Sequence, residues 1–361
     1  MREDPRTNMP TTYLIAAGGT AGHVVPALAV ADALRTDGAR VVFIGGDRAE
    51  AELVPRAGYE FEQLQIEGLD RKNPLRALRA LARAAAATFK AWKIIGALRP
   101  AAVLGGGGYV AGPVGAAAVL RRVPLVLTEA DSHFGLTNRL LAPFARRVCL
   151  AFPLEGRGGE RYVVTGRPIP PPAGDRLAAR ARFGLGAEDR VVVVVGGSLG
   201  ARSINEAALE AFGPQSDLRV IHAAGERDLA SLQERPRGAN YQLFGFIESF
   251  SDALLAADLV VSRSGGSVFE IAAAGRPAIL IPYPHAAADH QAGNARWMEE
   301  AGGAVVIADE RLSGQLLASE VDRMISNPRL LAGMAESSAS IARPEATASV
   351  AHELRTAGSG R

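Results

Sequence analysis

The sequence predicts an α/β fold made of two Rossmann-like, doubly wound domains that face a cleft. Short apolar runs rich in Val and Ile alternate with helix-like stretches along the chain, as is typical of parallel sheets covered by helices. The order of strand, glycine turn and helix that opens the chain at 12–34 returns at 190–209. A proline-rich segment at 167–175 separates the two halves.

Each half contains its own set of expected strands. In the first half these are residues 12–17, 40–44, 101–104, 123–128, 146–151 and 161–165. In the second half they are the apolar run that opens 190–209, followed by residues 218–223, 241–244, 258–262, 278–282 and 304–307. Sheets of this kind bind their ligands at the carboxyl ends of the strands, so the turns after the strands are the first candidates for a site.

The proline-rich segment fixes the expected domain organisation. Four prolines fall within RPIPPPAGD, residues 167–175, and such a segment forms a stiff, extended spacer. We therefore expect an N-terminal domain at 1–166, a linker at 167–175 and a C-terminal domain at 176–340. Residues 341–361 are expected to form a C-terminal helix that packs back on the N-terminal domain, with the tail RTAGSGR disordered.

Composition narrows the class of protein. A length of 361 residues favours two domains of ordinary size, and a net charge of +2 predicts no binding to nucleic acid. The single cysteine, Cys149, lies among apolar residues and has no partner for an internal disulfide, so we expect a buried thiol and no oxidising compartment. The start MREDPRTNMP is unlike a signal peptide and no run of 18 apolar residues occurs, so a soluble, cytosolic chain is expected.

Three glycine turns follow expected strands: GGTAGH at 18–23, GGGGYVAGPVG at 105–115 and GGSLGARS at 196–203. A glycine turn that leads into a helix offers free N–H groups and the positive end of the helix dipole to a phosphate. A tight strand-to-helix connection explains any one of them equally well, but three in one chain favour a phosphate-bearing ligand. None matches G-x-G-x-x-G or a P-loop in full, so a dinucleotide cofactor is not expected.

A fourth segment, SRSGGSVFE at 262–270, joins a Gly/Ser turn to the acidic residue Glu270. A carboxylate at the start of a helix stabilises the helix dipole, and this alone would explain it. The same carboxylate can also accept hydrogen bonds from the paired hydroxyls of a ribose. Taken alone, the segment favours the first explanation.

Together these motifs resemble those of the MurG family, the peptidoglycan N-acetylglucosaminyltransferases. In order they are GGTAGHVVPALAVADAL, GGGGYVAGPVGAAA, GLTNRLLAPFARRV, VVGGSLGARSIN, SRSGGSVFEIAAAGRPAILIPYP and HQAGNA, and they extend from about residue 12 to about residue 350. The resemblance implies a GT-B fold with a deep cleft. It also implies inverting transfer of GlcNAc from UDP-GlcNAc to the C4 hydroxyl of MurNAc in the polyprenyl-linked acceptor lipid I. The product is lipid II, made at the cytoplasmic face of the cell membrane.

The resemblance assigns roles to individual residues, with Glu270 on the ribose, the Ile247 backbone on uracil, and His290 and Gln291 on the GlcNAc hydroxyls. The residues expected to contact UDP-GlcNAc are Gly19, Thr20, Ala21, Asp131, Arg167, Ser198, Ile247, Arg263, Gly265, Gly266, Ser267, Val268, Phe269, Glu270, His290 and Gln291. Those expected at the acceptor are Gly22, Gly107, Gly108, Tyr109 and Asn138.

Three motifs depart from the family pattern. Ala21 replaces a glycine of the usual GTGGH, which suits a tight turn if φ at residue 21 is negative. The family motif HEQN is TEAD here, so its His and Asn are Thr128 and Asp131, and Asp131 can accept but not donate a hydrogen bond. The arginine expected shortly after TG-x-P is Pro170 here, so Arg167 is expected to serve instead.

The reaction needs a base for the attacking hydroxyl and a positive field for the departing UDP. An imidazole is suited to take the proton near neutral pH, so His23 is the expected catalytic base. Glu129 is the second candidate, because burial raises the pKa of a carboxyl. The alternative is that His23 is only a residue at the start of a helix and takes no part in the chemistry. No D-x-D motif lies where a bridging metal is expected, so helix N-termini, the Ser198 turn and Arg263 are expected to act without an obligatory metal cofactor.

A basic and aromatic helix is expected from Leu75 to about Ile95, within a stretch from Arg71 to Arg99 that holds eight basic residues and no acidic one. Its apolar stripe consists of Leu75, Leu78, Ala82, Ala85, Phe89 and Trp92, and its basic stripe of Arg76, Arg79, Arg83, Lys90 and Lys93. An ordinary helix that packs on the sheet also has an apolar stripe. The lack of acids beside two aromatic residues favours contact with an anionic membrane surface.

Three other functions share part of this pattern. A UDP-GlcNAc 2-epimerase has the same two-domain architecture, but the basic helix would be idle in it. A related GT-B glycolipid galactosyl- or glucosyltransferase is closer, and the GlcNAc-reading pair His290 and Gln291 argues against it. A non-catalytic nucleotide-sugar-binding protein would fit the changes at 128 and 131, but His23 and Glu270 are retained.

Overall fold

The computed structural model divides the chain into two compact units. It describes residues 10–66, 74–170, 174–197, 199–214, 216–286 and 289–360, and for 74–81 the backbone only. Unit 1 comprises Met1–Pro170 and Pro344–Arg361, and unit 2 comprises Pro171–Arg343. The division thus falls inside the proline-rich segment, and the chain returns to unit 1 after Arg343.

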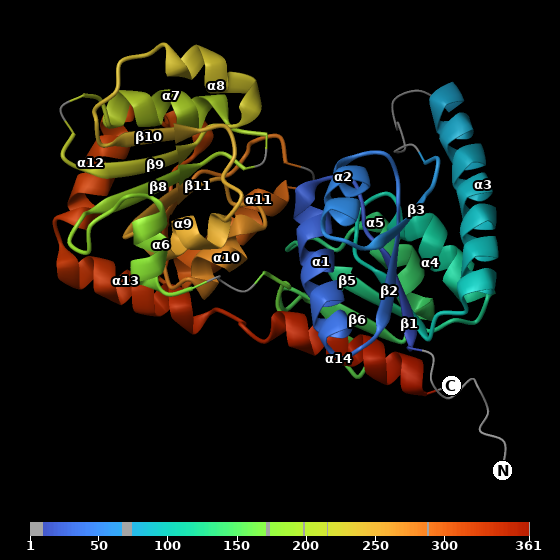
Figure 1. Ribbon diagram of the computed structural model, residues 1–361. Coiled ribbons are helices and arrows are strands. Elements are labelled where there is room, and N and C mark those ends of the chain that lie inside the picture. Colours follow the sequence, from blue (N-terminus) through green and yellow to red (C-terminus); the bar gives the residue numbers. More distant parts are fainter. Residues whose placement is uncertain are drawn as a thin grey trace. The chain divides into compact units, whose positions relative to one another are not determined.

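A sheet of seven parallel strands forms the centre of unit 1 (Figure 1). Its strands are β1 (Thr12–Ala16), β2 (Arg40–Gly45), β3 (Glu60–Gln63), β4 (Ala102–Gly105), β5 (Leu125–Glu129), β6 (Arg147–Leu150) and β7 (Tyr162–Val164). Their order is β3-β2-β1-β4-β5-β6-β7, so the direction of winding reverses between β1 and β4. The glycine turns after these two strands therefore share one edge of the sheet, where doubly wound folds bind ligands.

Helices cover both faces of this sheet. The helices of unit 1 are α1 (Ala21–Thr36), α2 (Ala49–Arg56), α3 (Pro74–Leu98), α4 (Ala111–Leu120), α5 (Leu136–Leu141), the 3-10 helix η2 (Ala142–Phe144) and α14 (Ala346–Ser359). One hydrophobic cluster joins the sheet to α1, α2 and α14, and another joins it to α3, α4 and α5. Leu14 and Ile15 are neighbours in β1 but belong to different clusters, which explains why this strand is buried at each position from Tyr13 to Ala16.

Unit 2 repeats the plan with a sheet of six parallel strands. The strands are β8 (Val191–Val195), β9 (Arg219–Ala223), β10 (Tyr241–Phe244), β11 (Leu259–Ser262), β12 (Ala278–Leu280) and β13 (Ala304–Val306). The helices are α6 (Arg176–Arg182), α7 (Arg202–Ala211), α8 (Glu226–Gln233), α9 (Phe250–Ala256), α10 (Ser267–Ala273), α11 (His290–Glu300), η4 (Asp309–Arg311), α12 (Gly314–Ile325) and α13 (Pro328–Ser340). The order β10-β9-β8-β11-β12-β13 reverses its winding between β8 and β11.

Two of the sequence expectations are wrong at the edges of the fold. The tail is helical as far as Ser359, because Leu354 and Ala357 are buried in the core of unit 1 and Arg355 pairs with Asp37. Strand β3 was not expected, since its sequence EFEQ is mostly polar and exposed. Polar residues suit it because β3 lies at the edge of the sheet.

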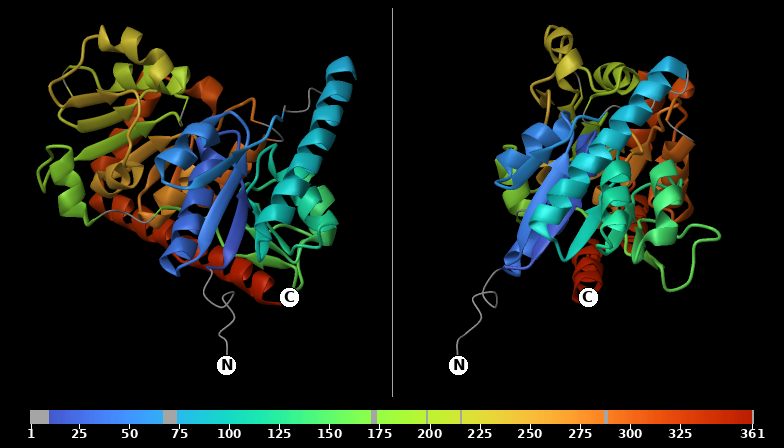
Figure 2. Two further views of the ribbon diagram at one scale, coloured as in Figure 1. Left: turned by 45° about the vertical axis from the view of Figure 1, so that its right-hand side comes forward. Right: turned by 90° about the vertical axis from the view of Figure 1, so that its right-hand side faces the viewer.

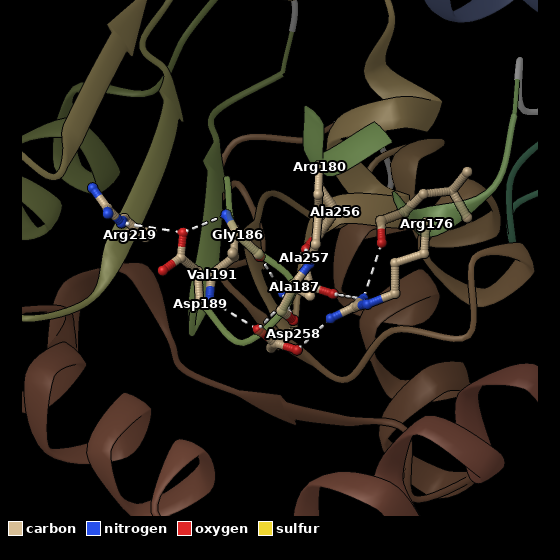
Figure 3. Close-up of polar contacts among 11 residues, drawn as sticks. Arg176, Arg180, Gly186, Ala187, Asp189, Val191, Arg219, Ala256, Ala257 and Asp258 are labelled. Carbon is tan, nitrogen blue, oxygen red and sulfur yellow. Dashed lines mark hydrogen bonds and ion pairs between the residues drawn. The ribbon is translucent and has the colours of Figure 1, made fainter. Parts of the chain in front are cut away.

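An ionic network anchors α6, the first helix after the linker, to the rest of unit 2 (Figure 3). Asp258 accepts hydrogen bonds from the guanidinium groups of Arg176 at 2.5 Å and Arg180 at 3.0 Å, and from the Val191 backbone N–H at 2.8 Å. Arg176 also donates to the carbonyls of Leu255 and Ala257, at the end of α9. The carboxylate therefore joins the start of β8 to α6.

Asp258→Ala is expected to lower the free energy of unfolding by about 2 kcal/mol. The change leaves the buried Arg180 guanidinium without its carboxylate, and the partial exposure of Arg176 and Asp258 keeps the loss below that of a fully buried pair. Urea denaturation of the whole chain measures it. Asp217→Ala, a change of an exposed carboxylate in unit 2, is the control, and equal stability of the two variants would contradict the role given to Asp258.

Candidate functional site

The two glycine turns of unit 1 pack directly on each other. Gly18 to Thr20 follow β1, and Gly106 to Tyr109 follow β4. Gly108 has φ +76°, and a Cβ at this position would run into the carbonyl oxygen of Gly18. Only glycine therefore permits this close contact between the turns. Ala21 is the first residue of α1 and has no positive φ, so alanine fits there.

His23 lies in the first turn of α1, against the second glycine turn. Its Nδ1 is 3.4 Å from the hydroxyl of Thr20. A Cβ at Gly107 would lie 2.7 Å from His23 Cδ2, so the glycine leaves the space that the imidazole fills. Gly22 is exposed, while its carbonyl accepts a hydrogen bond from Arg167. This part of unit 1 thus brings together His23, Gly22, Gly107 and Arg167.

Glu129 ends β5 and is only 8% exposed. Its Oε2 accepts hydrogen bonds from the Gly135 N–H at 2.8 Å and from Asn138 Nδ2 at 2.9 Å, and its Oε1 accepts from the Asp131 N–H at 3.4 Å. Burial, together with the nearby Asp131 charge, raises the pKa of this carboxyl despite the three hydrogen bonds that lower it. The carboxylate therefore holds the loop between β5 and α5, and this contact orders Asp131 through its backbone.

A small pocket of about 20 Å³ lies beside Glu129. Its walls come from the ends of β4 and β5, from α1 and from the segment after β7. They include Gly22, Gly106, Thr128, Glu129 and Arg167. Gly22, Glu129 and Arg167, three of the predicted residues, thus lie together at the carboxyl edge of the sheet of unit 1. Arg167 is 8% exposed and donates to the Gly22 carbonyl, so its contact with UDP-GlcNAc stays a prediction.

The raised pKa of Glu129 gives the stability of the protein a defined pH dependence. A carboxyl with a higher pKa in the folded state than in the unfolded chain costs stability as the pH rises through the interval between those two values. Glu129→Gln stays neutral, so its stability relative to the wild type should increase over that interval and be constant below it. Urea denaturation from about pH 4 to about pH 8 measures the difference; a difference independent of pH would contradict the raised pKa.

Unit 2 has its own pair of turns at the switch point between β8 and β11. Ser198, the expected donor contact in the first of these turns, lies outside the described residues. The second turn runs from Arg263 to Gly266 and leads into α10. Among the described residues, no three His, Cys, Asp or Glu side chains are grouped as a metal site; independence of metal remains a prediction.

Arg263 is 8% exposed and its guanidinium is used inside unit 2. It pairs with Asp309 at 2.6 Å and donates to the Ser203 hydroxyl at 2.9 Å. It also donates to the carbonyls of Ile281 and Pro282. The expectation that this cation faces the departing diphosphate therefore needs revision, because its charge is balanced by Asp309 and its N–H groups join α7, η4 and the segment after β12.

The turn before α10 is tied to the start of α11. The Ser264 hydroxyl donates to the carbonyl of Gln291 at 2.7 Å, and Asn294 Nδ2 donates to the carbonyl of Ser264 at 3.1 Å. Gln291 Oε1 accepts a hydrogen bond from the Tyr283 N–H at 3.0 Å. The buried Asn294 was not singled out from the sequence, although it lies in the motif HQAGNA. Its spacing of three residues from Gln291 is the signal that could have found it.

The other residues of unit 2 that are expected to contact UDP-GlcNAc fall into a buried group and a partly exposed group. Val268 and Phe269 are buried, as is Ile247, so any contact that they make with a nucleotide is through backbone atoms. Gly265, Gly266, Ser267, Glu270, His290 and Gln291 are partly exposed. Glu270 lies in the first turn of α10, and its contact with the ribose stays a prediction.

The basic helix α3 packs on the core of unit 1 through a face that differs from its predicted apolar stripe, and among the described side chains of that stripe only Trp92 lies against the core. Ala87, Ala91 and Ile95 form its buried face, whereas Ala82 and Ala85 are exposed and Phe89 is 57% exposed. The face with Ala87 and Ala91 is the buried one because small side chains allow α3 to lie close to α4. Of the predicted stripe, Ala82, Ala85 and Phe89 thus lie on the surface of unit 1, whereas Trp92 is partly buried against the core.

Aromatic and basic side chains are stacked on this exposed face. Phe89 and Trp92 stack with centroids 6.0 Å apart, and Lys93 Nζ lies 4.7 Å from the centroid of Phe89. Lys90 donates to the carbonyl of Gln63, and Arg83 is exposed. The side chains of Leu75, Arg76 and Arg79 lie outside the described residues. Figure 2 shows α3 extending beyond neighbouring elements of unit 1 at its N-terminal end. Within the described residues, no helix has the length and apolar character needed to cross a bilayer.

Glu50 was missed by the sequence interpretation. This fully buried carboxylate of α2 accepts hydrogen bonds from Gly19, Gly46 and Tyr109. Burial, with the nearby Glu50 charge as the next cause, raises the pKa of Tyr109 to about 12. The signal in the sequence is the glycine pair Gly45–Gly46 at the end of β2, followed by an acid in the next helix.

Comparison with known proteins identifies the family. The glycosyltransferase family 28 N-terminal domain matches residues 13–150, and the glycosyltransferase family 28 C-terminal domain matches residues 191–351. A Moorella thermoacetica protein named UDP-N-acetylglucosamine--N-acetylmuramyl-(pentapeptide) pyrophosphoryl-undecaprenol N-acetylglucosamine transferase is 41% identical, over 96% of this chain and 99% of that protein. A protein of the same name from Alkalilimnicola ehrlichii is 42% identical, over 95% of this chain and 98% of that protein.

A solved structure agrees with these matches. The crystal structure of Acinetobacter baumannii MurG has a TM-score of 0.76 and 32% identity, and the match covers 96% of this chain and 100% of that chain. With two parallel-sheet units and these relatives, the fold is GT-B and the protein is a glycosyltransferase. The chain belongs to glycosyltransferase family 28 and, within it, to the family of the MurG transferases.

Proposed function

We propose that the protein transfers GlcNAc from UDP-GlcNAc to the C4 hydroxyl of MurNAc in lipid I, with inversion at the anomeric carbon, and so makes lipid II for peptidoglycan. The observation that carries this proposal is the placement of His23 against the second glycine turn. A base held there meets the need of an attacking sugar hydroxyl. The names of the relatives supply the donor and acceptor.

Each unit has its own part in the proposed reaction. In unit 2, Glu270 binds the ribose, the Ile247 backbone binds uracil, and His290 and Gln291 bind the GlcNAc hydroxyls. In unit 1, the imidazole of His23 takes the proton of the C4 hydroxyl while that oxygen attacks the anomeric carbon. The bond between the anomeric carbon and the β-phosphate oxygen breaks, and UDP leaves. Glu129 orders the loop that carries Asp131, so we assign it a supporting role.

Product analysis tests this function. The whole protein is incubated with labelled UDP-GlcNAc and a lipid I analogue, with and without EDTA. The expected product is the β-linked disaccharide, formed at equal rates in both samples. Formation of UDP-N-acetylmannosamine without disaccharide would instead indicate a 2-epimerase. Binding of UDP-GlcNAc without turnover would indicate a non-catalytic protein, and loss of the rate in EDTA would overturn the independence of metal.

We propose further that the exposed face of α3 binds the cytoplasmic face of the cell membrane peripherally. Replacing Arg83, Lys90 and Lys93 by glutamine is expected to weaken binding to anionic vesicles about 10²-fold, because each basic side chain contributes about 1 kcal/mol near such a surface. Co-sedimentation with phosphatidylglycerol vesicles measures this loss. Phosphatidylcholine vesicles, which have no net charge, should bind both proteins equally weakly.

A matched variant of unit 2 controls for net charge. It carries glutamine at three exposed arginines, Arg311, Arg323 and Arg329. It should bind anionic vesicles like the wild type. Equal losses in the two triple variants would mean that vesicles respond to total charge, and the assignment to α3 would be wrong.

A further inference from the structure

We infer that Glu50 is a positioning residue for the acceptor side of the reaction, because its carboxylate fixes both glycine turns of unit 1. The inference rests on the proposed function. Glu50 lies in the first turn of α2 and has no exposed surface. Both of its carboxylate oxygens accept hydrogen bonds from donors outside α2.

Three segments meet on this one carboxylate. Glu50 Oε2 accepts a hydrogen bond from the Gly19 N–H at 2.8 Å. Oε1 accepts one from the Gly46 N–H at 2.9 Å and one from the Tyr109 hydroxyl at 3.0 Å. These donors follow β1, β2 and β4, which are neighbours in the order β2-β1-β4. The carboxylate therefore joins the ends of three adjacent strands at the switch point.

The glycines around Glu50 leave room for this arrangement. A Cβ at Gly18 would lie 2.6 Å from Glu50 Oε1, and a Cβ at Gly45 would lie 2.7 Å from Glu50 Cγ. A Cβ at Gly46 would collide with the Tyr109 hydroxyl. Glycines at these positions are thus needed in part to make room for the Glu50 carboxylate, and not only for a bound phosphate.

The Glu50 carboxylate reduces the number of hydrogen-bond donors that the turns can offer to an acceptor. The Gly19 N–H and the Tyr109 hydroxyl already donate to Glu50, so they are not spare donors for a pyrophosphate. The Tyr109 ring lies 3.7 Å from where a Gly19 Cβ would be, and Gly107 of the same turn borders His23. Glu50 therefore acts by setting the position of Tyr109 and of the turn beside the proposed base, rather than by contacting substrate.

Kinetics of Glu50→Gln test the inference. An amide places a donor where the carboxylate accepts three hydrogen bonds, so the turns must shift. A displacement of about 1 Å at a site costs about 10²-fold in rate, and we expect kcat/KM for the lipid I analogue to fall by about that factor. The affinity for UDP, measured by calorimetry, should stay at the wild-type value, because UDP is assigned to unit 2.

Two further variants separate positioning from a loss of folding. Glu52→Gln changes an exposed acid in the same helical turn and should keep wild-type kinetics. Gly46→Ala keeps Glu50 but its methyl group displaces the Tyr109 hydroxyl, so it should reproduce the fall in acceptor kcat/KM without loss of UDP affinity. It also serves if Glu50→Gln does not fold.

The outcomes are distinct from those for the proposed function. The wild-type rate of disaccharide formation, measured first, decides the function, and the ratio of variant to wild type decides the inference. Wild-type acceptor kinetics in either Glu50→Gln or Gly46→Ala would overturn the role of Glu50. Parallel losses of acceptor kinetics and UDP affinity in both variants would also overturn it, since they would show a general structural effect.

Discussion

Replacing His23 with alanine is expected to lower kcat about 10²-fold or more while the affinity for UDP is unchanged. The C4 hydroxyl of a sugar is a poor nucleophile, and general-base catalysis supplies a factor of about 10² to 10⁴. His23 fills the space beside Gly107 at the junction of the two glycine turns, which is where we place the base. Single-turnover kinetics with saturating UDP-GlcNAc measure the chemical step directly.

The pH dependence of this variant identifies the proton acceptor. If His23 is the base, the acid limb of the pH–rate profile should disappear in His23→Ala. His352→Ala, a change of an exposed histidine on α14, is the control and should keep both rate and profile. A loss of less than about threefold in His23→Ala, far below what a general base supplies, would reduce His23 to a residue that starts a helix. Glu129 would then become the candidate base.

Local patterns in the sequence were sufficient to predict the fold. Strands β1 and β8 are apolar at successive positions because both of their faces are buried, and that pattern can be read without any distant contact. The glycine turns could also be predicted without any distant contact, because each directly follows an apolar strand in the sequence. Strand β3 and the tail of α14 were missed because their structure depends on a sheet edge and on the core of unit 1, neither of which is local.

The polar contacts of the site could not be predicted in the same way. Glu50 accepts hydrogen bonds from Gly19 and Tyr109, which are 31 and 59 positions away. Arg263 pairs with Asp309, which is 46 positions away. The sequence indicates that these groups are charged but does not identify their partners, so a buried structural carboxylate and a ligand-binding one look alike. His23, by contrast, has its role suggested by the turn that immediately precedes it.

Replacing Arg263 with alanine is expected to lower the free energy of unfolding by about 3 kcal/mol, since the mostly buried Asp309 carboxylate loses its counter-ion and keeps, within the described part of the chain, only the hydrogen bond from Ser203. UDP affinity should fall with stability, because the carbonyls of Ile281 and Pro282 lose the group that holds them beside the turn before α10. Urea denaturation and calorimetry with UDP measure the two effects. Arg311→Ala, an exposed arginine of η4, is the control and should change stability by less than about 0.5 kcal/mol.

The lysine variant decides what Arg263 contributes. Arg263→Lys keeps the positive charge but loses the planar group that reaches Asp309, Ser203 and two carbonyls together. If the internal network is what matters, the lysine variant should resemble the alanine variant in both stability and UDP affinity. If the charge acts on the departing diphosphate, lysine should restore most of the UDP affinity while stability stays low. The contacts of Arg263 favour the first result, because Asp309 already balances its charge and the N–H groups that contact Ser203 and the two carbonyls are directed into unit 2.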